Sequence, residues 1–122
     1  MTKPNGSEAT PLPTLDPSAG HVTFVNVFSV EPERAEELLE ILSRATETVM
    51  RHLPGFISAN LHVSEDRRRV LNYAQWRRRA DHEAMLQNPE ARVHMGEAAQ
   101  VAQSFDPTFY ELRHSHTPGG PR

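Results

Sequence analysis

The sequence predicts an α+β fold of the ferredoxin-like type, an antiparallel sheet with two helices packed on one face. Four segments alternate between apolar and polar residues as β-strands do, and two segments carry apolar residues at helical spacing. In chain order they run strand, helix, strand, strand, helix, strand, which is the ferredoxin-like βαββαβ order. The length of 122 residues suits one such domain.

The predicted domain covers residues 21–113 and lies between two tails. Residues 1–20 are rich in Pro, Thr, Ser and Gly and show neither period, so we expect a disordered or extended arm without chemistry of its own. Residues 114–122 are polar and rich in Pro and Gly, which predicts a flexible tail.

The first strand and the first helix follow directly from the pattern. Residues 21–29 are rich in β-branched and aromatic residues, with Asn26 in the middle of an otherwise apolar face. Pro32, flanked by two glutamates, suits the first turn of a helix, and Pro54-Gly55 ends it. The predicted buried stripe of this helix is Leu38, Leu39, Leu42, Ala45, Val49 and Leu53.

A β-hairpin comes next, formed by residues 56–64 and 70–76 and joined by the polar residues 65–69. The first of its strands places Ile57, Ala59, Leu61 and Val63 on one face and Ser58, Asn60 and His62 on the other. The register of the hairpin decides whether Asn60 and His62 share a face with Asn72, and the sequence leaves that open.

The second helix is interrupted at Asn88-Pro89, because proline breaks a helix and restricts the residue before it. The expected pieces are residues 80–87, with Ala84 and Met85 inward, and residues 90–103, with Met95 in the apolar stripe and His94 at its edge. Many of these residues are small, which either leaves room for a ligand or permits a close approach of helix and sheet. Residues 108–113 are the expected last strand.

Composition excludes several classes of partner. The chain has 13 Lys and Arg against 16 Asp and Glu, so we expect no nucleic-acid partner. It has no cysteine, no apolar run that could span a bilayer and no signal-peptide core, which predicts a cytoplasmic protein without a membrane partner. The outer face of the sheet still needs cover, so we expect a homodimer that buries Val25, Val27, Ile57 and Leu61.

The strand 70–76 carries the strongest candidate for a ligand site. Its alternation puts Asn72 and Trp76 on the same face, where packing alone would favour aliphatic residues, because a buried amide costs free energy unless it finds partners. Either the pair faces a ligand, or Asn72 bonds to a neighbouring loop and Trp76 anchors the core. Asn26 permits the same two interpretations. His114 and His116 have a spacing that can bind metal, but we expect no metal site because further ligand candidates are absent nearby.

Residues 22–112 resemble the antibiotic biosynthesis monooxygenase family of dimeric α+β barrel proteins. The resemblance is carried by VNVFSVEPERAEELLEIL in the first strand and helix, by Pro54-Gly55-Phe56, and by NYAQW followed by a helix. It implies a ferredoxin-like fold that dimerises into an α+β barrel. The same superfamily includes quinone-forming monooxygenases, haem-degrading enzymes and small-molecule isomerases.

The pair Asn72 and Trp76 is similar to the pair that lines the cavity of members oxidising aromatic polyketides to quinones. The resemblance implies an oxygenase that uses O2 and a small anthrone or phenol substrate, without flavin, haem or metal. Such a reaction requires an enolate that reacts with O2 directly, exclusion of water, and donors for the developing oxyanion.

The resemblance also implies roles for particular residues. The expected catalytic residues are Asn72 and Trp76 as donors, and His62 and His82 as proton-transfer groups. The expected substrate-binding residues are Asn26, Asn60, Met85, His94 and Met95, and His94 is a further candidate for proton transfer. Members often place a tyrosine shortly after the tryptophan, where this chain has His82.

Two alternatives remain at this point. In the haem-degrading branch Asn26 matches a distal asparagine and His94 lies near the axial histidine, whereas Met85 or a neighbour replaces the expected tryptophan of the second helix. The other alternative is a dimeric small-ligand-binding module without catalysis.

Overall fold

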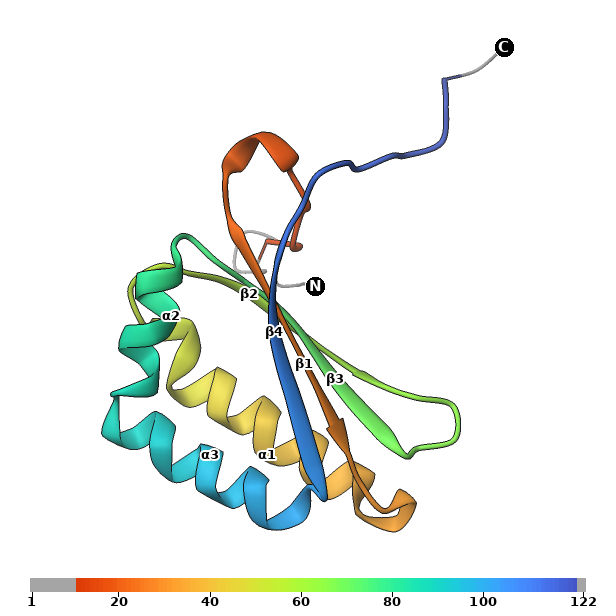
Figure 1. Cartoon of the computed structure of the whole chain (residues 1–122), viewed down its shortest axis with the longest axis vertical. Coiled ribbons are helices and arrows are strands. Elements are labelled where there is room, and N and C mark those ends of the chain that lie inside the picture. Colours follow the sequence, from red (N-terminus) through yellow and green to blue (C-terminus); the bar gives the residue numbers. More distant parts are fainter. Residues whose placement is uncertain (1–10, 121–122) are drawn as a thin grey trace, which may run out of the picture.

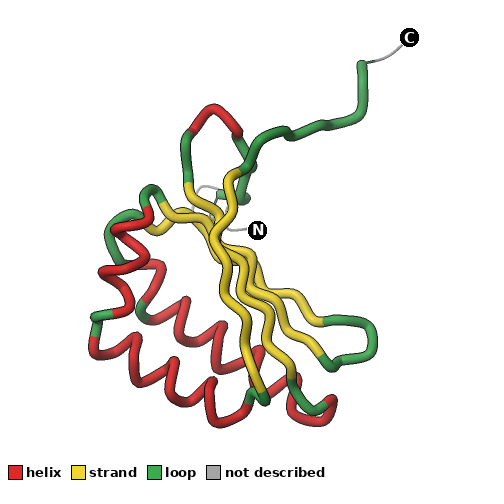
Figure 2. The backbone as a smooth tube through the Cα atoms, in the orientation of Figure 1, coloured by secondary structure: helices red, strands yellow, loops and turns green. Residues whose placement is uncertain are grey.

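The computed structural model describes residues 11–120; residues 1–10 of the predicted arm and residues 121–122 of the predicted tail lie outside the described residues. The described chain forms one antiparallel sheet with strand order β2-β3-β1-β4, and its α-helices lie on one face of that sheet (Figure 1, Figure 2). The elements are β1 (Val22–Ser29), α1 (Ala35–Thr48), β2 (Phe56–Val63), β3 (Arg69–Trp76), α2 (Arg79–Leu86), α3 (Pro89–Val101) and β4 (Ser104–Glu111). The predicted ferredoxin-like α+β fold is confirmed.

Strands β1 and β3 form the centre of the sheet. They pair so that Asn26 lies opposite Asn72 and Phe24 lies opposite Ala74. Because side chains two residues apart share a face, Asn26, Asn72 and Trp76 all lie on the side of the sheet that the helices cover. The pairing of β1 with β3 therefore brings Asn26 next to Asn72, two residues that the sequence had placed on separate strands.

The hairpin of β2 and β3 has the opposite consequence for two predicted site residues. Leu61 lies opposite Asn72 and faces the helices, whereas Asn60 lies opposite Tyr73 and, with His62, faces the outer side. The register thus does not bring Asn60 and His62 to the face of Asn72, and the prediction that Leu61 covers the outer face is wrong. Because side chains of a strand alternate, either of two sets of β2 side chains can face the helices. The more apolar set, which includes Leu61, does so.

Helix α1 is shorter than its apolar stripe predicted. It follows a 3-10 turn, Pro32–Arg34, and ends at Thr48, because the backbone of Val49 leaves helical geometry (φ −126°, ψ −64°) before a second 3-10 turn, Met50–His52. Leu38 and Ala45 are buried, in agreement with the predicted stripe. Its exposed ion pairs, such as Arg44–Glu40, add only about 0.3–0.5 kcal/mol each.

The second helical segment breaks where the sequence predicted. The side-chain Oδ1 of Asn88 accepts the backbone N–H of Ala91 at 3.0 Å, and Pro89 occupies the first turn of α3, where a missing N–H is tolerated. Helix α2 buries His82 and Met85. Ala84, which was predicted to point inward, is exposed.

Strand β4 begins earlier than predicted, at Ser104 and not at residue 108. It is an edge strand that pairs only with β1, with Pro107 opposite Asn26. A proline is tolerated at an edge because its missing N–H removes no central ladder bond, so the Asp106-Pro107 pair does not end the strand. Strand β4 thereby extends along the whole of β1.

The outer face of the sheet is partly covered by residues 11–20. Gln75, which is buried, donates from its Nε2 to the carbonyl oxygen of Thr14 at 3.0 Å. Pro13 and Leu15 line a hollow of about 290 Å³ together with side chains of β2 and β3. Among the described residues, no helix is both long enough and apolar enough to cross a bilayer.

Candidate active site

Two small cavities lie between the sheet and the helices. The first, which we call the Trp76 cavity, has a volume of about 70 Å³ and is lined by Trp76, Asn72 and His82 among largely apolar side chains. The second, the Asn26 cavity, has a volume of about 110 Å³ and is lined by Asn26, His94 and Met95, again among largely apolar side chains. Of the nine predicted site residues, only Asn60 and His62 lie outside both cavities.

Three buried polar atoms around these cavities have no hydrogen-bond partner within the described part of the chain. They are Asn26 Oδ1, Asn72 Oδ1 and His82 Nδ1. A buried acceptor without a partner costs about 1–3 kcal/mol, which is why such atoms are rare in folded proteins. Their concentration around two neighbouring cavities favours the ligand-facing interpretation of Asn26 and Asn72 over the interpretation that they bond to neighbouring protein groups.

His82 projects from α2 into an aromatic environment. Its ring centroid lies 4.3 Å from that of Phe24, 5.0 Å from that of Phe109 and 5.8 Å from that of Trp76. The guanidinium carbon of Arg79 lies 4.3 Å from the centroid of Phe109. Burial among these rings lowers the pKa of His82, since desolvation disfavours the imidazolium and outweighs the nearby charge of Glu83. The side chain is therefore neutral near pH 7.

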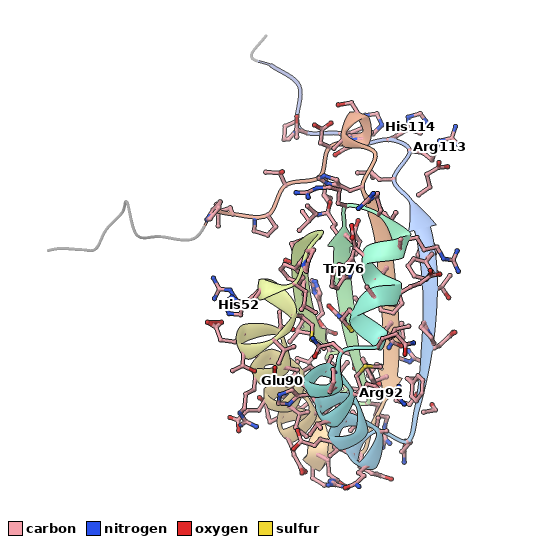
Figure 3. All side chains as sticks on the ribbon, turned by 90° about the vertical axis from the view of Figure 1, so that its left-hand side faces the viewer. His52, Trp76, Glu90, Arg92, Arg113 and His114 are labelled. Atoms are coloured by element: carbon pink, nitrogen blue, oxygen red, sulfur yellow. The ribbon has the colours of Figure 1, made fainter. Side chains whose placement is uncertain are left out.

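Trp76 forms the floor of its cavity at the end of β3. It is 2% exposed and makes an edge-to-face contact with Phe56, with the ring centroids 5.5 Å apart. Figure 3, which looks onto the helical layer, shows Trp76 on the sheet beside α2. The indole is fixed on rigid elements, as a group that must be positioned accurately needs to be.

His94 extends from α3 at the edge of the Asn26 cavity. Its Nδ1 lies 3.2 Å from Glu97 Oε1, one turn further along the helix. If Nδ1 carries the proton that this carboxylate accepts, Nε2 is left as an acceptor. The side chain is only partly exposed, so this acceptor is available at the cavity edge.

Asn60 and His62 belong to a different surface. Asn60 Nδ2 donates to the carbonyl oxygen of Tyr73 at 2.9 Å, so this amide has a structural partner. Both residues line the outer hollow beneath Pro13 and Leu15, and His62 is exposed. The sheet separates them from Asn72 and Trp76, so neither can act with that pair within one chain.

Sequence reasoning did not assign to the site the four residues that line the Trp76 cavity from α1 and the turn after it: Leu42, Ala45, Thr46 and Met50. Leu42 and Thr46 are four residues apart on one face of α1, a spacing that was available as a signal, whereas Met50 lies beyond the end of the helix. Within residues 11–120 no group of three or more His, Asp or Glu side chains is arranged to hold a metal ion. The rings of His114 and His116 stack with their centroids 6.3 Å apart.

The fold is that of a ferredoxin-like α+β protein with two small cavities between its sheet and its helices. Residues 21–97 match the model of the antibiotic biosynthesis monooxygenase family, and the chain belongs to this family. It is 43% identical over 104 residues to tetracenomycin-F1 monooxygenase of Streptomyces glaucescens, a match that covers 85% of this chain and 92% of the relative. The chain is therefore an enzyme of the monooxygenase class, and the predicted family is confirmed.

Solved structures support the same assignment of the fold. The monooxygenase ActVA-Orf6 of Streptomyces coelicolor, in complex with nanaomycin D, superposes with a TM-score of 0.74 at 27% identity, covering 85% of this chain and 96% of that one. SnoaB, a cofactor-independent oxygenase from Streptomyces nogalater, superposes with a TM-score of 0.70 at 23% identity, covering 79% of this chain and 96% of that one. The second likeness concerns the fold alone.

Proposed function

We propose that this enzyme oxidises a polycyclic anthrone or phenol to a quinone with O2 and without a cofactor. The observation that carries the proposal is a group of three buried polar atoms that have no partner among the described residues and belong to residues lining the two neighbouring cavities: Asn26 Oδ1, Asn72 Oδ1 and His82 Nδ1. A ligand that hydrogen-bonds to these atoms recovers the free energy that their burial costs. The apolar walls around them suit the flat rings of an aromatic substrate.

His82 is the proposed general base. Because burial lowers its pKa, the imidazole is neutral near pH 7 and able to accept a proton from the methylene carbon of an anthrone or from a phenol. The electron-rich enolate that results can react with O2 directly. The surrounding rings of Phe24, Trp76 and Phe109 keep water away from this step.

Asn72 and Trp76 are the proposed donors to the developing oxyanion. An amide and an indole N–H are both neutral donors, and in a dry cavity each stabilises a negative oxygen more strongly than water would. Rotation about χ2 exchanges the amide oxygen and nitrogen of Asn72, so the side chain can turn its NH2 group towards the substrate.

The reaction balances without an external reductant. O2 adds to the deprotonated carbon as a peroxide, and the imidazolium of His82 returns its proton to that peroxide. His82, neutral again, takes the second hydrogen of that carbon as a proton, and the O–O bond breaks to form the carbonyl group and hydroxide. The hydroxide accepts this proton and leaves as water. One oxygen atom remains in the quinone and the other leaves as water.

The relatives support this function over the two alternatives. One is a tetracenomycin-F1 monooxygenase, and another is a monooxygenase in complex with nanaomycin D. Asn26 and His94 do line one cavity, as the haem interpretation expected, but Met85 lines the other cavity and offers no aromatic ring. Haem degradation and non-catalytic ligand binding therefore have less support.

A homodimer that packs sheet against sheet completes the proposal. The outer face of the central strands carries Val25, Val27, Leu71 and Tyr73, all partly exposed. Such a surface on the side opposite the helices suits a second copy of the chain, since two like sheets can pack about 10 Å apart.

The experiment that tests the proposed function measures O2 uptake by metal-free enzyme with a model anthrone. We expect Asn72→Ala to lower kcat roughly 10²-fold, which is the usual effect of removing one oxyanion donor. Asn60→Ala is the matched control, because it removes the same side chain from the outer face of the sheet. Equal rates for Asn72→Ala and the wild type would refute the role of Asn72, and absence of protein-dependent uptake would refute the function.

A further inference from the structure

The two cavities are neighbours that share a wall. Leu42, Ala45 and Met50 line both of them. Asn26 and Asn72 lie directly opposite each other in the sheet, yet they line different cavities. The wall therefore meets the sheet between Asn26 and Asn72. Its side chains come from α1 and from the turn after α1.

Met50 is the most adaptable residue of this wall. A methionine side chain has three rotatable bonds and fills irregular spaces, whereas an alanine cannot move out of the way. Met50 is also the first residue of a 3-10 turn, directly after the non-helical Val49, so it does not lie within a regular helix. The sequence has 4 methionines, and all of them except Met1 line the two cavities.

Neither cavity alone has room for a substrate of three or four fused rings. Their volumes are about 70 and 110 Å³, whereas pockets that enclose small organic ligands usually measure about 300–1,000 Å³. Displacement of the Met50 side chain would join the two spaces into one elongated chamber and would add the volume that this side chain occupies. That chamber runs from Trp76 and His82 at one end to Asn26 and His94 at the other.

We infer that the Asn26 cavity is a second subsite, which binds the hydroxylated, non-reacting end of a fused-ring aromatic, and that Met50 is the movable partition between the subsites. The inference rests on the proposed function, which places the reacting carbon beside Asn72, Trp76 and His82. Met50 would then set the number of rings that the enzyme accepts.

The chemistry of the Asn26 cavity specifies this part of the ligand. Its walls are largely apolar, which suits an aromatic ring, and Met95 and Phe105 at its rim are exposed, so the cavity opens to solvent between α3 and β4. It offers two acceptor atoms: Asn26 Oδ1, which has no partner among the described residues, and Nε2 of His94, which is an acceptor when Nδ1 donates to Glu97. A phenolic hydroxyl supplies a donor for these two atoms.

The first test uses the single tryptophan of the chain as a reporter of binding. Quenching of Trp76 fluorescence gives dissociation constants for a hydroxynaphthoquinone, a dihydroxyanthraquinone and a hydroxynaphthacenequinone, which have two, three and four fused rings. If the joined chamber is populated about a tenth of the time in the wild type, Met50→Ala tightens binding of the three- and four-ring compounds roughly tenfold. Binding of the two-ring compound should stay close to wild type.

A second test fills the proposed subsite with one variant and compares it with a matched control. Ala99→Phe, on the exposed rim of the Asn26 cavity, should weaken binding of the larger quinones at least roughly tenfold, by excluding the far ring. The two-ring compound should still bind. Ala84→Phe is the matched control, because Ala84 is exposed on α2 and lines neither cavity. Met50→Leu, which keeps the volume of the partition, should behave as the wild type.

The outcomes separate this inference from the proposed function. A change that is equal for all three quinones, or no change in either Met50→Ala or Ala99→Phe, would overturn the subsite even if O2 uptake depends on Asn72. If the effects of these variants depend on ring number, the subsite is supported. If the wild type shows no O2 uptake, the proposed reaction is refuted and the subsite is not affected.

Discussion

His82 illustrates at the scale of one residue how burial prepares a group for chemistry. Its side chain is 4% exposed, its Nδ1 lacks a partner among the described residues, and three aromatic rings surround it. These surroundings lower its pKa below the ordinary value of about 6.5. A histidine held neutral in this way destabilises the folded protein in acid, because the unfolded chain binds the proton more readily.

We therefore predict a specific pH dependence of stability. As the pH falls from about 6.5 towards the lower pKa of folded His82, the wild type should lose stability relative to His82→Phe, by at most about 1.4 kcal/mol per pH unit for one proton. Above pH 7 the difference should be constant, since the imidazole is neutral in both states. Urea unfolding of both proteins between pH 5 and pH 8 measures this, and parallel curves throughout would show that His82 does not titrate differently on folding.

At the scale of elements, the close approach of Gly55 and Asp81 fixes the position of α2. Gly55 has a positive φ of 82°, and a Cβ at this position would overlap the side chain of Asp81 in the first turn of α2. The carbonyl oxygen of Gly55 also accepts the backbone N–H of Arg77 at 2.6 Å. Because His82 follows Asp81, this contact determines how deeply His82 enters the Trp76 cavity.

Gly55→Ala should consequently affect both stability and the site. We expect a loss of about 2–4 kcal/mol, from backbone strain at positive φ together with overpacking against Asp81. Gly20→Ala is the control, because Gly20 has a similar φ of 73° and a methyl group added there would meet, apart from its chain neighbours, no atom of residues 11–120 within 4 Å. It should cost only about 1–2 kcal/mol. Equal losses in denaturant unfolding would mean that α2 does not depend on the contact with Asp81.

At the scale of the whole molecule, the two faces of the sheet have different tasks. The helix-covered face holds the cavities, and the outer face presents Val25 and Val27 from the central strand β1. Such a face is stabilised when a second copy covers it, and a domain of this size gains appreciably from additional buried area.

We predict that the wild type sediments as a dimer and that Val25→Glu shifts it towards monomer. Two carboxylates buried without partners across the interface should raise the dimer dissociation constant roughly 10²-fold or more. Val93→Glu, on an exposed position of α3, should leave the dimer intact. Analytical ultracentrifugation measures both, and a dimer that tolerates Val25→Glu would place the interface elsewhere.

The alternation in the strands and the spacing in the helices were sufficient to predict the fold and the positions of most residues of the candidate site. The pattern of residues 70–76 placed Asn72 and Trp76 on one face, and the pattern of residues 21–29 placed Asn26 among apolar neighbours; the structure bears out both placements. These relations are local, because the direction of a side chain in a strand depends only on its own position.

Tertiary structure alone decided how these local patterns meet. The strand register set Asn26 opposite Asn72 and moved Asn60 and His62 to the outer face. The packing of α2 against Gly55 brought His82 to Trp76, and the end of α1 placed Met50 between the two cavities. The sequence by itself determined which face of each element is polar. The size of the Trp76 cavity and of the Asn26 cavity, and the wall between them, depend on contacts between residues far apart in the chain. No single segment encodes these contacts.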